Sequence, residues 1–357
     1  MDQTTRPPLS FGEAAQMRVR EHEREYPVAP NLVAPAGTFA YPSGTSAYQR
    51  GTFAYQEAGR EGPSYYGLPL LKEPVWKPVV PLYFWIGGAA GAASTLSAMA
   101  RLVGGRALDP LARRARLVGA VGDLIGAGLL TYDLGRPARF LNMLRVFNPR
   151  SPMSIGSWVL ASSGAANTGA LLLQDRRGFL GALGDLAGAI GGLIGMPLAG
   201  YTGVLLANTA VPLWNLGRRS LPLLFMASGV ATAGSLLTVT ATSDRERAAA
   251  ERYAIAGKIG ELAATAALHY DVRRESPRAA RPLTRGTSGA LLTTATALTA
   301  ASLLSSLVPG RSRSKLRNTA LLGALGSLLL RFAIHHAGKS SARDPQASFA
   351  SQRRIPK

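Results

Sequence analysis

The stretch YDLGRPARFLNMLRVFNPRSPMSIGSW, residues 132–158, decides the fold because it lies between two long apolar runs. The flanking runs, 117–134 and 154–174, are each close to the roughly 20 apolar residues that a helix needs to cross a bilayer. Between them stand an aspartate, arginines and prolines, which form turns rather than a further crossing. Only helices or closed barrels span a membrane, and runs of this length predict helices. The pattern therefore predicts an all-α, polytopic membrane protein.

The composition agrees with a membrane protein that carries polar tails. Of the 357 residues 47% are hydrophobic, yet the mean hydropathy is only +0.10, because long polar ends dilute an apolar centre. The net charge of +20 would suggest nucleic acid in a soluble protein. Here the basic residues form short clusters between apolar runs, as in membrane loops, so we expect membrane lipids and no nucleic acid as partners. These clusters are spread almost evenly over both sides, which leaves the orientation open.

Three regions follow from this pattern. Residues 1–78 form a polar tail rich in Pro, Gly and Tyr, with an interfacial lead-in at its end; 79–336 form an eight-helix transmembrane bundle; 337–357 form a basic tail. Within the first tail, GTFAYPS, GTSAYQR and GTFAYQE (37–57) repeat in tandem, as either a disordered tail or a strap that binds a partner. The eight expected spans are 79–103, 117–134, 154–174, part of 179–216, 221–243, 253–270, 287–308 and 316–335.

The chain contains no cysteine, which excludes thiolate-bound iron–sulfur clusters and covalent c-type haem. Its four histidines are His22, His269, His335 and His336, and we expect only His269 to lie at depth within a span, because His335 is the last residue of the eighth. A transmembrane b-type haem needs two facing histidines, so no haem and no metal site are expected. Any electron that reaches this chain must then come from a partner protein and pass to a bound organic molecule.

The polar loop itself offers specific chemistry. Gly135 and Pro137 should end the second span directly after Asp133. Asp133 stands beside Arg136, so the two can form an ion pair that fixes the loop, and Ser154 can cap the third span. The same pair could instead form one wall of a pocket for a polar headgroup. The residues alone leave these two roles open.

Three stretches carry a resemblance to a known family. Residues 132–158, together with GYTGVLLANTAVPLW (200–214) and SYYGLPLLKEPVWKPVVP (64–81), resemble the NrfD/PsrC family of polysulfide-reductase-like membrane subunits. The resemblance implies a multi-pass subunit of a bacterial cytoplasmic membrane that has no redox centre of its own. Its implied partners are a ferredoxin-like iron–sulfur subunit and a molybdopterin- or tungstopterin-type catalytic subunit. Its implied cofactor is a quinone, either menaquinone or ubiquinone, with which it would exchange electrons.

The resemblance also implies a quinone site. Tyr201 could hydrogen-bond a quinone carbonyl, although a membrane tyrosine more often only anchors or packs a helix. Tyr83 stands where the polysulfide-reductase branch has Asn- and His-type groups, and it is the obvious polar substitute. The expected quinone-binding residues are Asp133, Arg136, Arg139, Tyr201, Tyr83 and Trp158.

Ionisable residues within spans are costly and are therefore candidates for function. Asp123, Lys258, Glu261 and His269 are the expected members of a proton path, and proton translocation would follow from it. Lys258 and Glu261 are three residues apart on one helix face, so they could instead form a buried pair that only holds helices together. Two other functions remain open. One is a transporter or channel, although such proteins typically contain an inverted internal repeat and none is found in this sequence. The other is a structural anchor without a quinone site.

Overall fold

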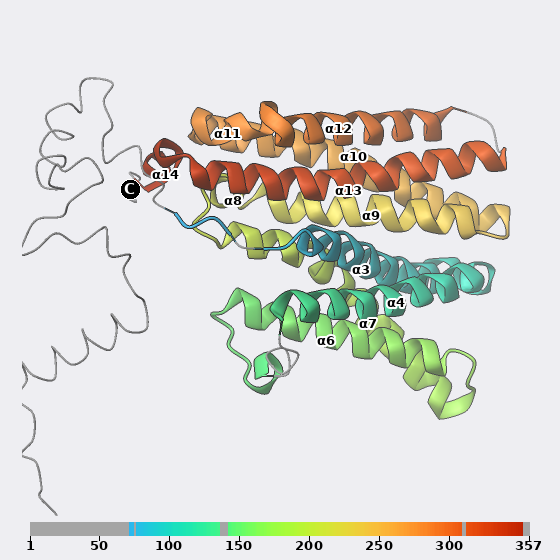
Figure 1. Cartoon of the computed structure of the whole chain (residues 1–357). Helices are drawn as coiled ribbons and strands as arrows, with labels where there is room; N and C mark the ends of the chain where they lie inside the picture. The colour runs from blue at the N-terminus through green and yellow to red at the C-terminus, as the bar shows by residue number, and fades with distance from the viewer. Residues whose placement is uncertain (1–70, 75, 136–141, 309–311, 353–357) are drawn as a thin grey trace, which may run out of the picture. The chain divides into compact units, whose positions relative to one another are not determined.

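The computed structural model of the chain describes residues 71–74, 76–135, 142–308 and 312–352 (Figure 1). The chain divides into two units, Met1–Leu68 and Pro69–Lys357, and every described residue belongs to the second. In the described part of that unit all regular structure is helical. The tandem repeats at 37–57 lie outside the described residues.

Eight of the described helices are 21 residues or longer, and they run alongside one another (Figure 1). They are α3 (Val79–Gly104), α4 (Asp109–Leu134), α6 (Pro152–Leu173), α7 (Gly178–Ala207), α9 (Ser220–Thr240), α10 (Asp244–Glu275), α12 (Gly286–Leu307) and α13 (Arg313–Arg343). Four short helices join or follow them, namely η3 (Gly105–Leu108), α8 (Pro212–Leu216), α11 (Pro277–Thr284) and α14 (Pro345–Gln352).

Six of the long helices are apolar and long enough to cross a membrane: α3, α4, α7, α9, α12 and α13. This confirms an all-α polytopic membrane protein. The other two long helices differ in composition, since α6 is rich in Ser and Gly and α10 carries many charged residues. Both nevertheless pack along apolar neighbours, α6 on α7 and α10 on α9. The expected number of eight crossings therefore stays a prediction.

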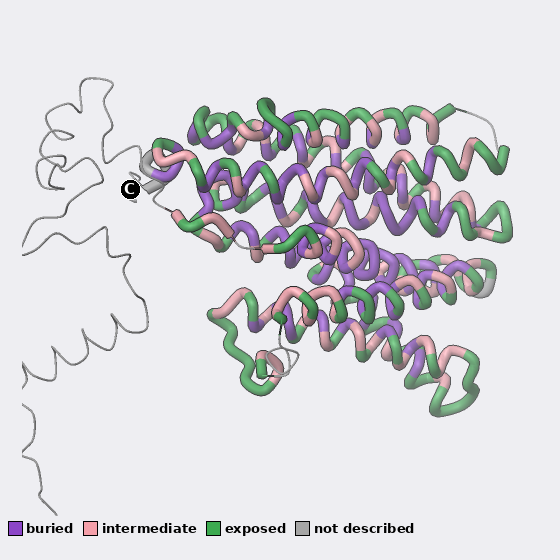
Figure 2. The backbone as a smooth tube through the Cα atoms, viewed as in Figure 1, coloured by how far each residue is buried: buried purple, intermediate pink, exposed green. Residues whose placement is uncertain are grey.

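Exposed and buried residues are distributed as a lipid environment requires. Figure 2 shows buried backbone towards the middle of the bundle and exposed backbone on its outer helices. Large apolar side chains lie on the outside, such as Leu102, Phe179 and Leu193, which are 82%, 81% and 79% exposed. Such a surface would be unfavourable in water but suits lipid tails. Many serines and threonines, in contrast, are buried inside the bundle.

The bundle consists of two groups of four helices. In the first group α3 packs on α4 and α7, and α6 packs on α7 and α4. In the second group α9 packs on α10 and α13, and α12 packs on α13 and α10. The groups meet where α3 and α7 contact α9 and where α3 contacts α13. We call this contact the seam.

Glycines allow α3 and α7 to approach closely. A Cβ atom built on Gly91 of α3 would lie 2.2 Å from the backbone oxygen of Gly195 on α7, and the converse distance is also 2.2 Å. One turn earlier on α7, a Cβ on Gly192 would lie 2.3 Å from the Cβ of Ala98. No larger residue fits at these positions without separating the helices, because real Cβ contacts are never this short. Small residues thus set the helix spacing, as expected for packing within a membrane.

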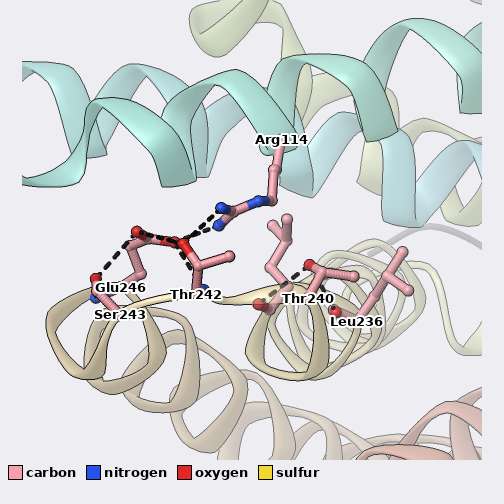
Figure 3. Close-up of polar contacts among 7 residues, drawn as sticks. Arg114, Leu236, Thr240, Thr242, Ser243 and Glu246 are labelled. Atoms are coloured by element: carbon pink, nitrogen blue, oxygen red, sulfur yellow. Dashed lines mark hydrogen bonds and ion pairs between the residues drawn. The ribbon is translucent and has the colours of Figure 1, made fainter.

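A polar cluster fixes the turn between α9 and α10 to α4 (Figure 3). Ser243 caps α10: its hydroxyl accepts a hydrogen bond from the Glu246 backbone N–H at 3.3 Å and donates one to Glu246 Oε1 at 3.0 Å. Arg114 of α4 reaches across to form an ion pair with Glu246 Oε2. Burial raises the pKa of the Glu246 carboxyl, but the hydrogen bonds from Arg114, the Thr242 N–H and Ser243 outweigh it and lower the pKa below its ordinary value.

The segment before α3 is attached to α13 and α8. Trp76 stacks on Trp214 with ring centroids 5.5 Å apart, and its carbonyl accepts a hydrogen bond from Lys339 at 3.3 Å. Arg343 binds both carboxyl oxygens of Glu73, at 2.8 and 3.1 Å. That hydrogen-bonded contact lowers the pKa of the Glu73 carboxyl. The described part of the expected interfacial lead-in is thus held at one end of the bundle.

The C-terminal region is helical beyond the expected end of the bundle. Helix α13 continues past residue 336 to Arg343, and α14 follows it. Ala337 and Ala342 are fully buried, because this last part of α13 packs against α8 and α11. The boundary expected near 336 does not coincide with the end of a helix.

Candidate functional site

The polar loop between α4 and α6 begins and ends as its sequence indicates. Helix α4 ends at Leu134, and Gly135 follows in the left-handed region with φ +71°, which glycine adopts without strain. Arg136 and Arg139, both expected in the quinone site, lie outside the described residues, so the ion pair of Asp133 with Arg136 stays a prediction. Asp133 lies in the last turn of α4 and is partly exposed.

The start of α6 differs in one detail from expectation. The cap is Ser151, whose hydroxyl accepts a hydrogen bond from the Ser154 N–H at 3.4 Å, because the helix begins at Pro152 rather than at Ser154. The Ser154 hydroxyl instead turns back to the loop. It donates to the Val146 carbonyl at 3.3 Å and accepts from the Asn148 N–H at 3.0 Å. Both serines therefore fix the loop onto the beginning of α6.

Tyr201 joins this loop to α7. Its hydroxyl donates a 2.6 Å hydrogen bond to the carbonyl of Pro152, and its side chain is 9% exposed. The ring lies directly over Gly156, where an added Cβ would stand 1.7 Å from the ring carbon Cζ. The loop end and the fourth long helix are consequently in contact, which is the arrangement that a pocket between them would need.

Tyr83 and Asp123 are buried in the same group of helices. Tyr83 is 4% exposed and packs against α4, where a Cβ on Gly126 would lie 3.5 Å from its ring. Asp123 lies three residues before Gly126 on α4, on the same helix face on which the Tyr83 ring packs. The structure therefore places Tyr83 beside the face of α4 that carries Asp123, although the sequence predicts a separate proton path for Asp123.

Asp123 is held by side chains of α6. Its Oδ2 accepts hydrogen bonds from the Ser163 hydroxyl at 2.8 Å and from the Asn167 amide at 2.7 Å. Its Oδ1 is buried and has no hydrogen-bond partner among the described residues. A buried carboxyl oxygen without a partner is unfavourable, so this oxygen is available to a proton or to a ligand donor.

Trp158 lies apart from this cluster. It is 38% exposed and makes an edge-to-face contact with Phe147, with ring centroids 6.0 Å apart. Both rings line a shallow apolar groove of about 520 Å³ on the outside of α6, together with Ile155, Val159, Ser162 and Ile194. Residues two apart on a helix point to nearly opposite sides, so Trp158 faces away from Tyr201, which covers Gly156. The two residues do not line one common pocket.

The charged residues of α10 form a second polar centre, in the other group of helices. Lys258 and Glu261 are 2% and 1% exposed, as expected for one buried face. They do not form an ion pair with each other: the Lys258 ammonium donates to Ser306 at 2.9 Å, while Glu261 accepts from Thr299 at 2.7 Å and from Ser327 at 2.6 Å. Hydroxyl groups of α12 and α13 take the place of the expected partner.

The polar face continues along α10 towards the end where the loop lies. The Thr265 hydroxyl donates to the Glu261 carbonyl at 2.7 Å, and His269 Nδ1 lies 3.0 Å from the Thr265 carbonyl oxygen. His269 is partly buried and lines a surface groove with Arg273, Arg281 and Arg285. The expected line from Lys258 to His269 is therefore present as one continuous face.

Sequence reasoning missed Arg331, although a charged residue within the run LLLRFAI was the signal for it. Arg331 is 1% exposed and donates to the carbonyl of Phe225 at 2.8 Å. Its guanidinium lies 3.7 Å from the centre of the Phe225 ring and interacts electrostatically with Glu261. It also approaches α3, since a Cβ on Gly88 would lie 3.0 Å from its Nη2. Arg331 thus connects the second polar centre to the seam.

Residues 70–338, which include seven of the eight long helices and most of α13, match the family described as polysulphide reductase, NrfD. The chain belongs to the NrfD family. Membership in the NrfD family implies a membrane subunit of a quinone-linked oxidoreductase, and it confirms the resemblance seen in the sequence. No curated protein matches the chain. No group of three or more potential metal ligands occurs in the described part of this NrfD-family chain.

Proposed function

We propose that this NrfD-family chain exchanges electrons between an iron–sulfur partner subunit and the quinone pool of a bacterial cytoplasmic membrane. The observation that carries the proposal is the family match across residues 70–338. A molybdopterin- or tungstopterin-type subunit would supply or take up the electrons on the far side of the iron–sulfur protein. Because the chain has no cysteine, the iron–sulfur clusters belong to the partner, and the quinone, menaquinone or ubiquinone, is the group that this chain would hold.

The proposed quinone pocket lies at the bundle end that carries the loop. Tyr83 is near the start of α3, Asp133 at the end of α4 and Tyr201 near the end of α7, and Figure 1 shows these helix ends on the same side. Each is within about seven residues of its helix end, roughly 10 Å along the axis. A headgroup at this depth can meet polar side chains while its isoprenoid tail stays in lipid.

The members of the proposed pocket have different tasks. The Tyr83 phenol would donate to a quinone carbonyl, and the Tyr201 oxygen, whose proton is donated to Pro152, would accept from a quinol hydroxyl. Asp133 with Arg136 and Arg139 would close the pocket at the membrane surface. The outward position of Trp158 suits the tail instead, because the groove beside it is apolar and open to lipid. When bound, the quinone supplies the two-electron chemistry; the side chains orient it and hold or release protons.

The first test is to extract lipids from the purified complex and measure quinone per chain. A ratio near one supports the proposal, whereas quinone at the level of the surrounding membrane leaves only a structural anchor or a transporter. Asp133→Asn should then slow quinone-linked turnover by about tenfold, if one charged hydrogen bond is lost, and leave dye-linked turnover intact. Asp175→Asn is the matched control, because Asp175 pairs with Arg113 at the other end of the bundle.

A proton route along α10 is the second part of the proposal. Lys258, Glu261, Thr265 and His269 extend over 11 residues, roughly 16 Å or half the apolar thickness of a bilayer. Asp123 would serve the quinone directly, since it shares with Gly126 the face of α4 on which Tyr83 packs. Buried ionisable groups on one face are the parts that a proton relay needs.

Glu261→Gln tests this route, because the amide keeps an acceptor for Thr299 but cannot carry a proton. In proteoliposomes we expect quinone-linked proton uptake or release to fall by roughly tenfold or more. Asp244→Asn, at the exposed start of the same helix and paired with Arg247, should leave it unchanged. If the Glu261 variant and the control variant translocate the same number of protons per quinone, the route is excluded. Quinone retained in the Glu261 variant would show that the quinone pocket is intact.

A further inference from the structure

A groove at the opposite end of the bundle from the proposed quinone pocket has the features of a lipid site. It encloses about 460 Å³ between α3, α4 and α7, near the turns that join α3 to α4 and α6 to α7. Its outer wall is apolar, and Met99, Leu102 and Leu193 there are 48%, 82% and 79% exposed. Lipid acyl chains can pack against this apolar wall.

The inner wall of the groove carries charge. Arg101 is paired with Asp185 at 2.8 Å, and both side chains are partly exposed. Arg116 is also part of the wall, yet it is only 2% exposed. Its contact with Asp185 is long, at 3.5 Å. Two arginines facing one aspartate leave a net charge of +1 at this depth.

The guanidinium of Arg116 has donors to spare. Its Nε and Nη1 atoms are buried without a hydrogen-bond partner among the described residues. Arginine donors without acceptors are costly in an apolar environment. The group is packed over Gly188, where a Cβ would lie 2.8 Å from Nη2, and Arg116 is one of the residues that line the groove. An oxygen-rich anion with charge −1 would satisfy both the charge and the donors.

We propose that this groove binds one anionic phospholipid, with its phosphate on Arg101 and Arg116 and an acyl chain along Leu193. A free phosphate ion would match the arginines but would leave the apolar wall unused. A zwitterionic lipid would match the apolar wall, but its headgroup would bring a further positive charge next to the two arginines. The combination of an apolar wall and surplus positive charge therefore selects an anionic lipid.

The full-length chain, purified with its native partners, provides the test. Native mass spectrometry would follow binding of phosphatidylglycerol, with phosphatidylcholine and inorganic phosphate as comparison probes. We expect one tightly bound phosphatidylglycerol per chain and about tenfold weaker binding in Arg101→Gln, because one charged hydrogen bond to the phosphate is lost. Ala189→Phe, which fills the exposed groove without changing its charge, should weaken binding as well.

Arg113→Gln is the matched control, because Arg113 is an exposed arginine of α4 at the same bundle end, paired with Asp175 and outside the groove. Its affinity for phosphatidylglycerol should equal that of the native chain. Equal binding of phosphatidylcholine, or equal losses in Arg113→Gln and Arg101→Gln, would overturn the proposal. If inorganic phosphate saturates the site and phosphatidylglycerol binds no more tightly than phosphate, the groove is a site for a free anion and the lipid proposal is refuted. None of these outcomes depends on the quinone pocket.

Discussion

Replacing Tyr201 by phenylalanine separates its structural role from its proposed role in quinone binding. The substitution keeps the ring that covers Gly156 and removes only the hydroxyl, which donates to the Pro152 carbonyl at 2.6 Å. Tyr253 offers the same change elsewhere, because its hydroxyl donates to the Ala92 carbonyl at 2.9 Å, between α10 and α3. Both hydroxyls thus join two helices, Tyr201 from a buried side chain and Tyr253 from a partly buried one, and only Tyr201 lies by the loop.

The two variants should lose similar stability. A single hydrogen bond contributes about 0.5–1.5 kcal/mol net, and each variant loses one. In both cases the carbonyl left behind belongs to backbone near a helix packing contact. Their thermal midpoints should therefore fall by comparable amounts.

Quinone kinetics should differ between them. The one proton of the Tyr201 hydroxyl is donated to Pro152, but its oxygen can still accept a hydrogen bond from a quinol hydroxyl. That bond would contribute about 1 kcal/mol more, so the KM for quinol in Tyr201→Phe should rise by about fivefold. Turnover with a soluble dye, which bypasses the quinone, should stay as in the native complex. Tyr253→Phe should leave both activities unchanged. If the two variants show the same KM for quinol, Tyr201 only joins two helices through its hydrogen bond, and the quinone pocket lies elsewhere.

Two further predictions concern stability. Gly195→Ala should destabilise the bundle by about 1–3 kcal/mol because its methyl group would meet the Gly91 oxygen. Gly128→Ala is the control and should not destabilise it, because nothing lies within 4 Å of a Cβ at that position. Equal denaturation midpoints of the two variants would contradict the close α3–α7 contact. Glu246 has a folded-state pKa below its ordinary 4.5, so the stability that it contributes with Arg114 is complete above pH ~4.5 and is lost as the pH falls through the lower, folded-state pKa. Glu246→Gln should accordingly be less stable than the native chain near neutral pH but lose less on acidification, and parallel pH curves would refute this.

The sequence predicts the helices well because each span is a local property. The lengths and ends of the apolar runs fall within a few residues of α3, α6, α9 and α12. Larger differences occur where a helix continues in polar sequence: α4 begins at Asp109 and α10 at Asp244, eight or more residues before the expected spans. Hydropathy finds the part of a helix that meets lipid, whereas hydrogen bonding decides where the helix itself begins.

The candidate site is harder to predict because its contacts join distant segments. The sequence indicates that Glu261 is buried, but not that hydroxyls of α12 and α13 bind it instead of Lys258. It likewise indicates a tyrosine near the loop without showing that Tyr201 rests on Gly156. Partner choice depends on which helices are neighbours, and periodicity within one helix carries no information on that.

The position of Arg331 limits how the two polar centres can communicate. The centre around Asp123 lies among α3, α4 and α6, whereas that around Glu261 lies among α10, α12 and α13. Any proton passed between them must cross the seam, where glycine contacts leave little room for water. Arg331 is a buried charged group that interacts with Glu261 and also reaches α3 at Gly88. Loss of Arg331 should therefore weaken any coupling between the centres, whereas a quinone site served by Asp123 alone would tolerate it.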